Sequence, residues 1–365
     1  TEKISLGILF TTVEFAQPDV LKRISGFLGP LPIVGCSSLA IISNQGIFKH
    51  GLILVLLSLG ESVYFNAAEV RGINTRSATL CGEEFAQNLL YGFKNIRRDL
   101  GLIFSDGFLR DGSGFISGLQ EMLGRSFPFV GASASANLAS DKTYLYSGAE
   151  VLNDAACGIL WGGKLNFGLG IKHGWRPLGK PRYVTKSAAN VVYEIYSLPA
   201  AAIYKEYLNF DLVKLRKELK RISILYPIGV HLAGEDEYLL RNLVSIEDDE
   251  SLVFQSNIPQ GSSVRLMIGT KESCLNATHQ ALAEMKQGLV NRQINFVLVF
   301  DSISRYILLG RQAHKELEII REGLDKDTPI IGIYTYGEQA PLRAINYQGQ
   351  SYFHNQTITL LGIGG

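Results

Sequence analysis

The sequence predicts an α+β fold in which repeated β-α-β units feed antiparallel strands. Two observations support this prediction. A strand–helix–strand pattern occurs three times along the 365 residues, and each time the second strand begins with proline, two apolar residues and glycine. Each copy is then followed by further β-rich sequence. Self-similarity of this kind indicates that the copies form related structural units.

The three copies span residues 6–37, 100–133 and 296–334. The first strand of each copy is a short continuous apolar run, which is typical of a strand covered on both faces. Consecutive β-α-β units normally place their two strands parallel, with a right-handed crossover. In the third copy a single long helix is expected, because apolar residues recur there at helical spacing. These residues are Leu309, Ala313, Leu317, Ile320 and Leu324.

Antiparallel strands are expected after each copy. Residues 41–42 and 51–59 flank an Asn-Gln-Gly turn at 44–46, which predicts a hairpin or meander. The second and third copies are followed by corresponding pairs of β-rich segments, at 143–146 with 157–161 and at 345–347 with 357–361.

The sequence between the second and third copies lacks the strand–helix–strand pattern of the copies. Residues 174–179 are rich in turn formers and predict a loop, and Pro199 suits the start of a helix. Residues 211–222 predict an amphipathic helix whose basic side chains face solvent, and residues 238–268 predict a small meander. We place a domain boundary in this stretch, which divides the chain into residues 1–215 and 216–365.

Composition excludes several classes of protein. Lys and Arg number 35 and Asp and Glu number 34, for a net charge of +1, which argues against a duplex-DNA binder and against a polybasic membrane-surface protein. The longest apolar run, at 52–59, is too short to span a bilayer, and the first residues do not resemble a signal peptide. The four cysteines are widely separated without a Cys-x-x-Cys pair, as expected of reduced thiols. We therefore expect a cytoplasmic protein that neither binds nucleic acid nor inserts into a membrane.

Three glycine-marked strand ends are the best candidates for a binding site. Ligands of α/β units bind beyond the carboxyl ends of strands, and glycine lets a backbone come close. A hydroxyl group follows at an equivalent place in each copy. We expect these ends to surround a common hollow that a metabolite occupies; the alternative is that the glycines only permit tight strand packing. The residues concerned are Gly35, Cys36, Ser37, Gly131, Ser133, Gly332 and Tyr334.

Charged groups near these ends suit a ligand with an amino group and a carboxylate. Asp106 and Asp301 come just after buried strands, where a carboxylate either holds an amino group through charge-assisted hydrogen bonds or caps a helix. Arg176 carries the two-pronged donor that suits a ligand carboxylate, or it pairs structurally. Both interpretations stay open for each residue.

Two further polar segments, separated by a predicted hairpin, contain Tyr336, Glu338 and Asn355. Polar groups this dense beside apolar strands must find hydrogen-bond partners. They either form a structural network or line the binding pocket.

Catalytic and metal motifs are weak. Gly35-Cys36-Ser37 and the segment ending at Ser133 begin like a nucleophile elbow, but neither continues to a second glycine. No two of the six histidines have metal-ligand spacing, so zinc is not expected. One histidine suffices to hold haem, and His173, just before Gly174-Trp175, is the candidate.

Several of these segments together resemble the FIST sensory family, in both its N-terminal and C-terminal halves. The pieces that carry the resemblance are Gly-Trp-Arg-Pro-Leu-Gly at 174–179, Tyr-Gly-Glu at 336–338 and His-Asn-Gln-Thr at 354–357. They occur in the family's order, and the resemblance covers nearly the whole chain.

The resemblance implies a small-molecule sensory domain of signal transduction rather than an enzyme. It also implies an amino-acid-like ligand and a signalling partner such as a histidine kinase or a cyclase. One branch of the family binds haem and senses nitric oxide, so a haem-binding sensor is one alternative. A hydrolase or transferase acting on a small acyl or amino compound is a second alternative, and an adaptor without a ligand is a third.

Overall fold

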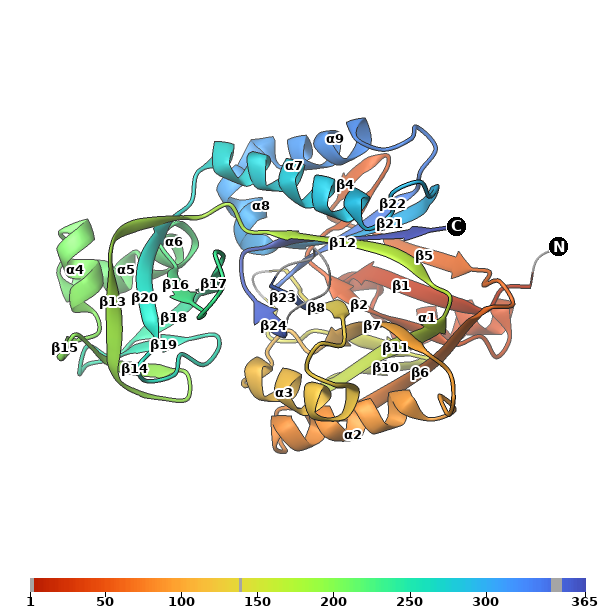
Figure 1. The fold of residues 1–365 in the computed structure, drawn as a ribbon, viewed down its shortest axis with the longest axis horizontal. Helices are drawn as coiled ribbons and strands as arrows, with labels where there is room; N and C mark the ends of the chain where they lie inside the picture. Colours follow the sequence, from red (N-terminus) through yellow and green to blue (C-terminus); the bar gives the residue numbers. More distant parts are fainter. Residues whose placement is uncertain (1–2, 138–139, 343–349) are drawn as a thin grey trace.

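The computed structural model describes residues 3–137, 140–342 and 350–365, and it confirms the α+β fold. Figure 1 shows two parts. The body contains the described residues up to 175 and from 269 onward, and the lobe contains residues 176–268. Among the described residues, no helix has both the length and the apolar character needed to cross a membrane.

All three predicted β-α-β units are present, and in each the two strands pair in parallel. Each marked glycine lies opposite an aliphatic residue of the first strand, in the pairs Leu9–Gly35, Ile103–Gly131 and Val299–Gly332. The elements of the first two units are β1 (Leu6–Thr12), α1 (Pro18–Leu28), β2 (Ile33–Ser38), β7 (Arg98–Ser105), α3 (Gly112–Leu123) and β8 (Phe129–Ser133).

The third unit corrects one prediction. Between β21 (Ile294–Ser302) and β22 (Ile330–Thr335) the chain forms two helices, α8 (Ile303–Leu309) and α9 (His314–Glu322). A short 3-10 turn separates them, and it begins at Gly310, whose φ of 56° ends α8. The prediction of one long helix is wrong because side-chain spacing does not reveal a glycine-mediated break.

The hairpin that follows each unit joins the sheet of a different unit. β3 (Ile41–Ser43) pairs with β22, β9 (Leu145–Ser147) pairs with β2, and β23 (Gly337–Pro341) pairs with β8. The second strands of these hairpins are β4 (Gly46–Phe48), β10 (Glu150–Leu152) and β24 (Ser351–His354). The exchange is therefore cyclic and ties the three units into one body.

A return strand then runs antiparallel to the first strand of its own unit: β5 (Leu52–Leu57) beside β1, β11 (Ala155–Gly163) beside β7, and β25 (Ile358–Gly364) beside β21. The Asn-Gln-Gly turn at 44–46 closes a hairpin, but the prediction that residues 51–59 supply its second strand is wrong, because β3 pairs with β4 and β5 pairs with β1. The segments 143–146 and 157–161 likewise belong to different sheets. The predicted strand at 345–347 lies outside the described residues.

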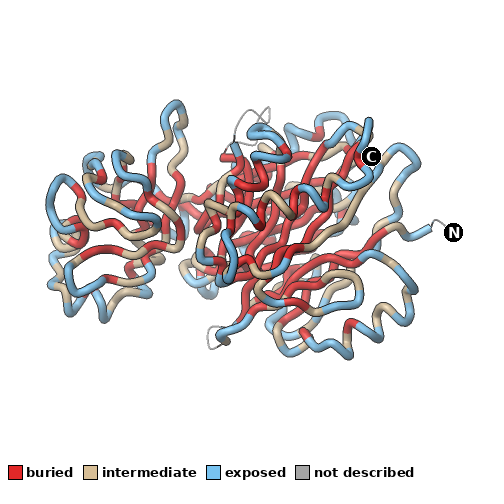
Figure 2. Tube along the Cα trace, turned by 90° about the horizontal axis from the view of Figure 1, so that it is seen from below, coloured by how far each residue is buried: buried red, intermediate tan, exposed pale blue. Residues whose placement is uncertain are grey.

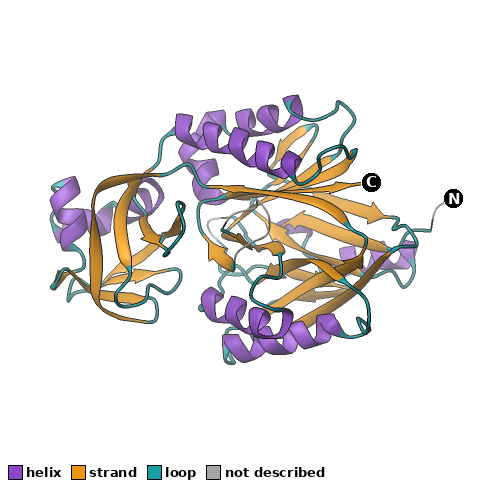
Figure 3. Cartoon of the chain, viewed as in Figure 1, coloured by secondary structure: helices purple, strands orange, loops and turns teal. Residues whose placement is uncertain are grey.

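The inner faces of the three sheets meet in one apolar core. Phe10, Phe104 and Phe300 occupy equivalent positions in the three units and touch edge to face, with ring centroids 5.5 to 6.4 Å apart. Figure 3 shows helices on the outside of this arrangement, and Figure 2 shows the buried strands within it. The remaining body elements are β6 (Val63–Arg71), α2 (Ala78–Leu90), β12 (Asn166–Lys172) and α7 (Lys271–Gln287).

The lobe has its own apolar core beneath a strongly bent sheet. Three predictions are corrected here. Residues 176–179 lie in a strand rather than a loop, and the predicted 211–222 helix divides at Glu218. Pro199 lies in a short strand, and the helix that follows begins three residues later at Ala202. The lobe elements are β13 (Arg176–Ala188), β14 (Val191–Ile195), β15 (Leu198–Pro199), α4 (Ala202–Leu208), α5 (Leu212–Lys217), α6 (Leu219–Leu225), β16 (Ile228–His231), β17 (Tyr238–Arg241), β18 (Leu243–Ile246), β19 (Leu252–Phe254) and β20 (Ser263–Ile268).

The predicted boundary between residues 215 and 216 lies inside α5, whereas the lobe spans residues 176–268. The chain enters the lobe from β12 and leaves it toward α7, so two crossings connect the lobe to the body (Figure 1).

The Gly131→Ala replacement is expected to lower the free energy of unfolding by about 1–3 kcal/mol. An added Cβ would lie 1.7 Å from the carbonyl oxygen of Ile103, so the parallel pair would have to move apart. Urea denaturation measures the effect. Gly26→Ala, at an exposed position of α1 with no atom within 4 Å of the added Cβ, should instead be neutral or stabilising. Equal effects of the two replacements would contradict this account.

Candidate functional site

The carboxyl ends of the three parallel pairs meet, as predicted. The Ser135 N–H donates to the carbonyl oxygen of Ser37 at 3.0 Å, and the Ser38 hydroxyl donates to that of Tyr334 at 2.9 Å. The side chains of Ser37 and Ser133 are fully buried and hydrogen-bonded to other protein groups. The prediction of an accessible hollow at this place is therefore wrong: the three ends pack against one another.

The glycines of these ends serve close strand packing. A Cβ at Gly35 would lie 1.9 Å from the carbonyl oxygen of Leu9, which matches the situation at Gly131. Cys36 is fully buried, and burial together with the neighbouring Cys157 raises the pKa of its thiol. These residues stabilise the body and offer no surface to a ligand.

Asp301 lies in a buried ion network. Nε of Arg305 donates to Oδ1 of Asp301 at 3.0 Å, and its Nη2 donates to Oε1 of Glu316. All three side chains are almost completely shielded from solvent. Burial and the nearby Glu316 raise the pKa of Asp301 well above its ordinary value. Burial would lower the pKa of Arg305, but Glu316 above all raises it, so the guanidinium stays charged.

The same arginine holds both crossings between body and lobe. Nη1 of Arg305 donates to the carbonyl oxygen of His173 at 2.7 Å, beside the first crossing. Its Nη2 donates to the carbonyl oxygen of Cys274 at 3.0 Å, beside the second. The network therefore fixes the two segments from which the lobe extends.

Glu338 lies next to this network. Its carboxylate accepts hydrogen bonds from the hydroxyl group of Thr335 and, at 2.7 Å, from that of Thr357. The Thr357 N–H also donates to it at 3.2 Å. Burial raises the pKa of Glu338 to about 7, although these hydrogen bonds lower it.

Within the described residues, neither Asp106 nor Arg176 forms a hydrogen bond or ion pair with Asp301, Arg305 or Glu338. Oδ1 of Asp106 accepts from the Phe108 N–H at 2.8 Å, and Oδ2 accepts from the Asp154 N–H at 2.9 Å, so Asp106 holds a turn together. Arg176 is exposed at the start of β13.

Tyr336 and Asn355 belong to the contact between body and lobe. The backbone oxygen of Tyr336 accepts from the Gln255 amide at 3.1 Å. The Asn355 amide donates to Oε1 of Gln255 at 2.9 Å, and its oxygen accepts from the Asn242 N–H at 3.3 Å. The polar segments identified in the sequence thus form a structural network, as one of the two open interpretations predicted.

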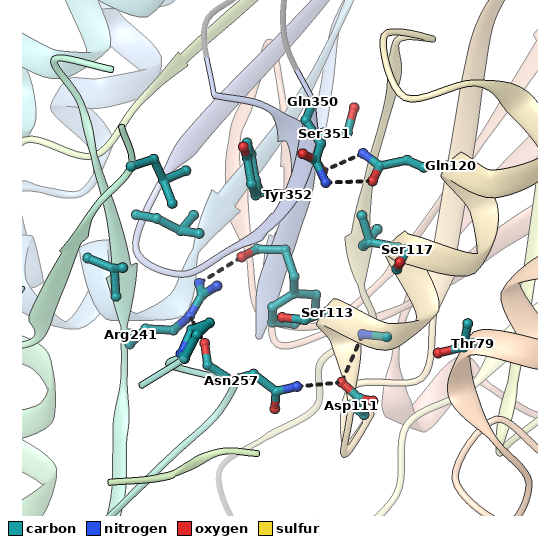
Figure 4. A pocket seen from close by; sticks show the side chains of 17 residues that line it. Thr79, Asp111, Ser113, Ser117, Gln120, Arg241, Asn257, Gln350, Ser351 and Tyr352 are labelled. Atoms are coloured by element: carbon teal, nitrogen blue, oxygen red, sulfur yellow. Dashed lines mark hydrogen bonds between the residues drawn. The ribbon is translucent and has the colours of Figure 1, made fainter. Parts of the chain in front are cut away.

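A cleft of about 460 Å³ lies between the body and the lobe. Figure 4 shows its walls, which come from α3 and β24 of the body and from β16 and β17 of the lobe. None of the binding residues predicted from the sequence lines it. The lining side chains that matter for recognition are Asp111, Ser117, Leu232, Leu239, Arg241 and Asn257.

Arg241 is the unusual group of this cleft. Its side chain is buried, with 4% of the residue exposed, and it forms no ion pair with a carboxylate of the described residues. Nη1 donates to the carbonyl oxygens of Leu240 at 3.0 Å and Phe353 at 2.9 Å. Burial lowers the pKa of Arg241 to about 9, so it remains a cation at neutral pH. A buried positive charge therefore lines the cleft, and within the described part of the chain its hydrogen-bond acceptors are backbone carbonyl oxygens.

Asn257 connects this cation to a carboxylate. The carbonyl oxygen of Asn257 accepts from Nε of Arg241 at 3.3 Å, and its side-chain amide donates to Oδ1 of Asp111 at 3.4 Å (Figure 4). Asp111 also caps α3 by accepting from the Gly114 N–H at 2.8 Å. The Asp111 carboxylate thus lies at the N-terminus of α3, and no carboxylate of the described residues forms an ion pair with Arg241.

Two family models match successive parts of the chain. The FIST N domain matches residues 5–196, and the FIST C domain matches residues 200–341. The chain belongs to the FIST family. Over 292 residues it is 27% identical to the uncharacterized protein MJ1623 of Methanocaldococcus jannaschii, a match that covers 73% of this chain and 54% of that protein. The chain thus spans about half the length of this relative.

His173 does not fit the haem that one FIST branch carries. Its Nδ1 accepts the Trp175 N–H at 2.9 Å, so the ring proton belongs on Nε2, which faces Oε2 of Glu237 at 3.5 Å. An axial ligand needs an available nitrogen lone pair. Burial lowers the pKa of His173 to about 4, which keeps the ring neutral. The residue instead orders the first crossing between body and lobe.

Arg241 and Asp111 are not among the site residues predicted from the sequence. A signal was present for Arg241, because it is the charged residue that ends the apolar strand Tyr238–Arg241. A charge in such a strand needs a partner or a function. Asp111 lies where a residue that caps a helix is expected. Other helices have caps of the same kind, so the sequence does not single out Asp111 as a binding residue.

Proposed function

We propose that this FIST protein senses a small amino-acid-like carboxylate that binds in the cleft between body and lobe. The observation that carries the proposal is Arg241, a buried guanidinium on the cleft wall that has no carboxylate partner among the residues the structure describes. Removing an ion from water costs several kcal/mol unless an opposite charge or strong hydrogen bonds offset it. A ligand carboxylate supplies that opposite charge.

The rest of the wall suits the other parts of such a ligand. Oδ1 of Asp111 is engaged by Gly114 and Asn257, which leaves its second oxygen for a ligand ammonium group. Leu232 and Leu239 provide apolar surface for a side chain. Ligand sites commonly combine an apolar lining with a few well-placed polar groups.

Binding would be converted into a signal by a shift between two arrangements of the lobe. The cleft has walls on both parts, so a ligand that contacts α3 and β17 together favours the arrangement that brings them to the right separation. A tenfold difference in affinity between the arrangements corresponds to about 1.4 kcal/mol. A partner such as a histidine kinase or a cyclase would respond to that difference.

Binding without chemistry is favoured over the hydrolase or transferase alternative. The hydroxyl group of Ser37 donates to the carbonyl oxygen of Ser135, and that of Ser133 contacts Ser105 and Gln339. Both groups are buried, and within the described residues neither forms a hydrogen bond with a histidine that could act as its base.

The Arg241→Met replacement is expected to weaken binding of the ligand carboxylate by roughly tenfold to hundredfold, because hydrogen bonds to charged groups contribute about 1.5–3 kcal/mol. The measurement is thermal shift followed by calorimetry, with amino acids, their amides, and aliphatic carboxylates such as isovalerate as probes. Carboxylates should stabilise the wild-type protein, and the matching amides should not.

Two further variants complete this test. Arg176→Met removes an exposed arginine outside the cleft and should leave binding unchanged. Ser117→Trp places a large ring in the cleft from an exposed position of α3 and should block every ligand without unfolding the protein. Undiminished binding to the Ser117→Trp variant would show that the cleft is not the site.

A further inference from the structure

The threefold repetition of the body leaves one strand position open. In the second unit β6 pairs antiparallel with the return strand β11, and in the third unit β12 pairs in the same way with β25. In the first unit, β5 is the last strand of its sheet, and no described strand lies on its far side. The first sheet therefore has five strands where the other two sheets of the body have six.

The open position leaves part of the central core incompletely covered. Core-facing residues of β11 and β25 are buried, among them Ile159 at 1% exposure and Leu361 at 0%. The equivalent residue of β5 is Val55, since Ile159, Leu361 and Val55 lie opposite Leu102, Leu298 and Ile8 of their first strands. Val55 is only partly buried. A strand beside β5 would complete its burial.

The backbone of β5 is ready to accept such a strand. The carbonyl oxygens of Gly51 and Leu57 accept hydrogen bonds from Thr12 and Ser5 on the β1 side. Successive residues of a strand direct their N–H and C=O groups to opposite sides. The backbone groups of Leu52, Leu54 and Leu56 therefore point away from β1 toward the open edge.

This edge lacks the usual protection against pairing. Exposed edge strands normally carry charges, proline or a bulge. Residues 51–60 contain neither a charged residue nor proline, and β5 pairs with β1 without a break in register. Leu52 and Leu56 are 37% and 40% exposed, respectively.

We propose that β5 pairs antiparallel with β5 of a second copy of this chain, about a twofold axis at Leu54. This register places Leu52 opposite Leu56 of the second copy and Ile53 opposite its Val55. Side chains that lie opposite one another then share a face of the sheet, and no charges meet. Leu54 of each copy directs its backbone N–H and C=O toward the other, so the open groups of both strands are satisfied.

A second copy suits this edge better than an unrelated strand because each copy has the same unmet requirement. Both strands need apolar cover for their core-facing side and hydrogen-bond partners at the same three residues. The pairing joins two sheets of five strands into one continuous sheet, in place of the sixth strand present in each of the other sheets of the body. This inference is independent of the ligand site, which lies between the body and the lobe.

The test is the molar mass of the full chain, measured by light scattering and sedimentation over a range of concentrations. Wild-type protein should form a dimer. Leu56→Lys should weaken the dimer at least tenfold, because an introduced charge would lie against Leu52 of the second copy. Leu56→Pro should do the same by removing an outward N–H, while leaving the bonds to β1 in place. Val213→Lys, at an exposed position of α5 in the lobe, should leave the dimer unchanged.

A charge-pair experiment fixes the register. Leu52→Glu and Leu56→Lys should each be monomeric alone, and an equimolar mixture should form a heterodimer, because position 52 of one chain then lies opposite position 56 of the other. A monomeric wild-type protein would overturn the proposal. So would a dimer that persists in both Leu56→Lys and Leu56→Pro. Circular dichroism establishes that each variant is folded before its mass is interpreted.

Discussion

The Arg305→Met replacement is expected to lower the free energy of unfolding by about 3–5 kcal/mol. The replacement leaves the carboxyl groups of Asp301 and Glu316 buried without their cation, and it removes the hydrogen bonds to the carbonyl oxygens of His173 and Cys274. The midpoint of urea denaturation, compared at constant slope, measures the effect.

A matched control separates this network from ordinary ion pairs. Arg71 also contacts two carboxylates, Glu69 and Glu150, but its side chain is exposed. Arg71→Met should therefore change the free energy of unfolding by no more than about 1 kcal/mol. If Arg305→Met has an effect as small as that of Arg71→Met, the buried network does not stabilise the fold in the way described.

The same network also orders the two chain segments that connect the lobe to the body. Arg305 holds a backbone oxygen beside each crossing, so its loss should make the crossings less ordered while the apolar cores of body and lobe stay intact. Hydrogen exchange should consequently increase most at residues near 173 and 274 in a variant that remains folded.

Local patterns in the sequence were sufficient to predict the three β-α-β units. A continuous apolar run followed by helical periodicity and a Pro-apolar-apolar-Gly segment describes each unit, and each is present with the expected parallel pairing. The cyclic exchange of hairpins could not be predicted in this way. β3 and β22 are far apart in the chain, and the alternation within a strand carries no information about which sheet it joins.

The predicted hollow at the glycine-marked strand ends is absent for a related physical reason. Glycine at a strand end permits close approach either of a ligand or of another backbone, and at Gly35 and Gly131 the backbone takes that place. The cleft instead combines Asp111 of the body with Arg241 of the lobe. The position of the lobe relative to the body decides which distant residues line the same cleft. Local sequence patterns do not predict that position.

Glu338→Gln is expected to change the pH dependence of stability. Burial raises the pKa of Glu338 in the folded protein to about 7 from an ordinary value of 4.5. Between these values the folded protein binds more protons at this site than the unfolded chain does, so the contribution of Glu338 makes stability fall as pH rises. The total change is about 3 kcal/mol, reached when both states are ionised above about pH 7.

Glutamine should reproduce the hydrogen bonds of the protonated acid. The Thr335 hydroxyl has its own acceptor in the carbonyl oxygen of Asp301, at 3.4 Å, so its oxygen can accept a hydrogen bond from the group at position 338. The side-chain oxygen of glutamine can still accept from the N–H and hydroxyl groups of Thr357. The variant should therefore match the wild type near pH 4 and exceed its stability by up to about 3 kcal/mol near pH 8.

Denaturation of both proteins across this pH range tests the expectation, because other titrating groups are common to both and cancel in the difference. Glu61→Gln, at an exposed position, should show no such divergence. A difference between the Glu338→Gln variant and the wild type that stays constant with pH would mean that Glu338 is ionised in the folded protein throughout. In that case the Thr335 and Thr357 hydrogen bonds, together with the charge of Arg305, outweigh the effect of burial.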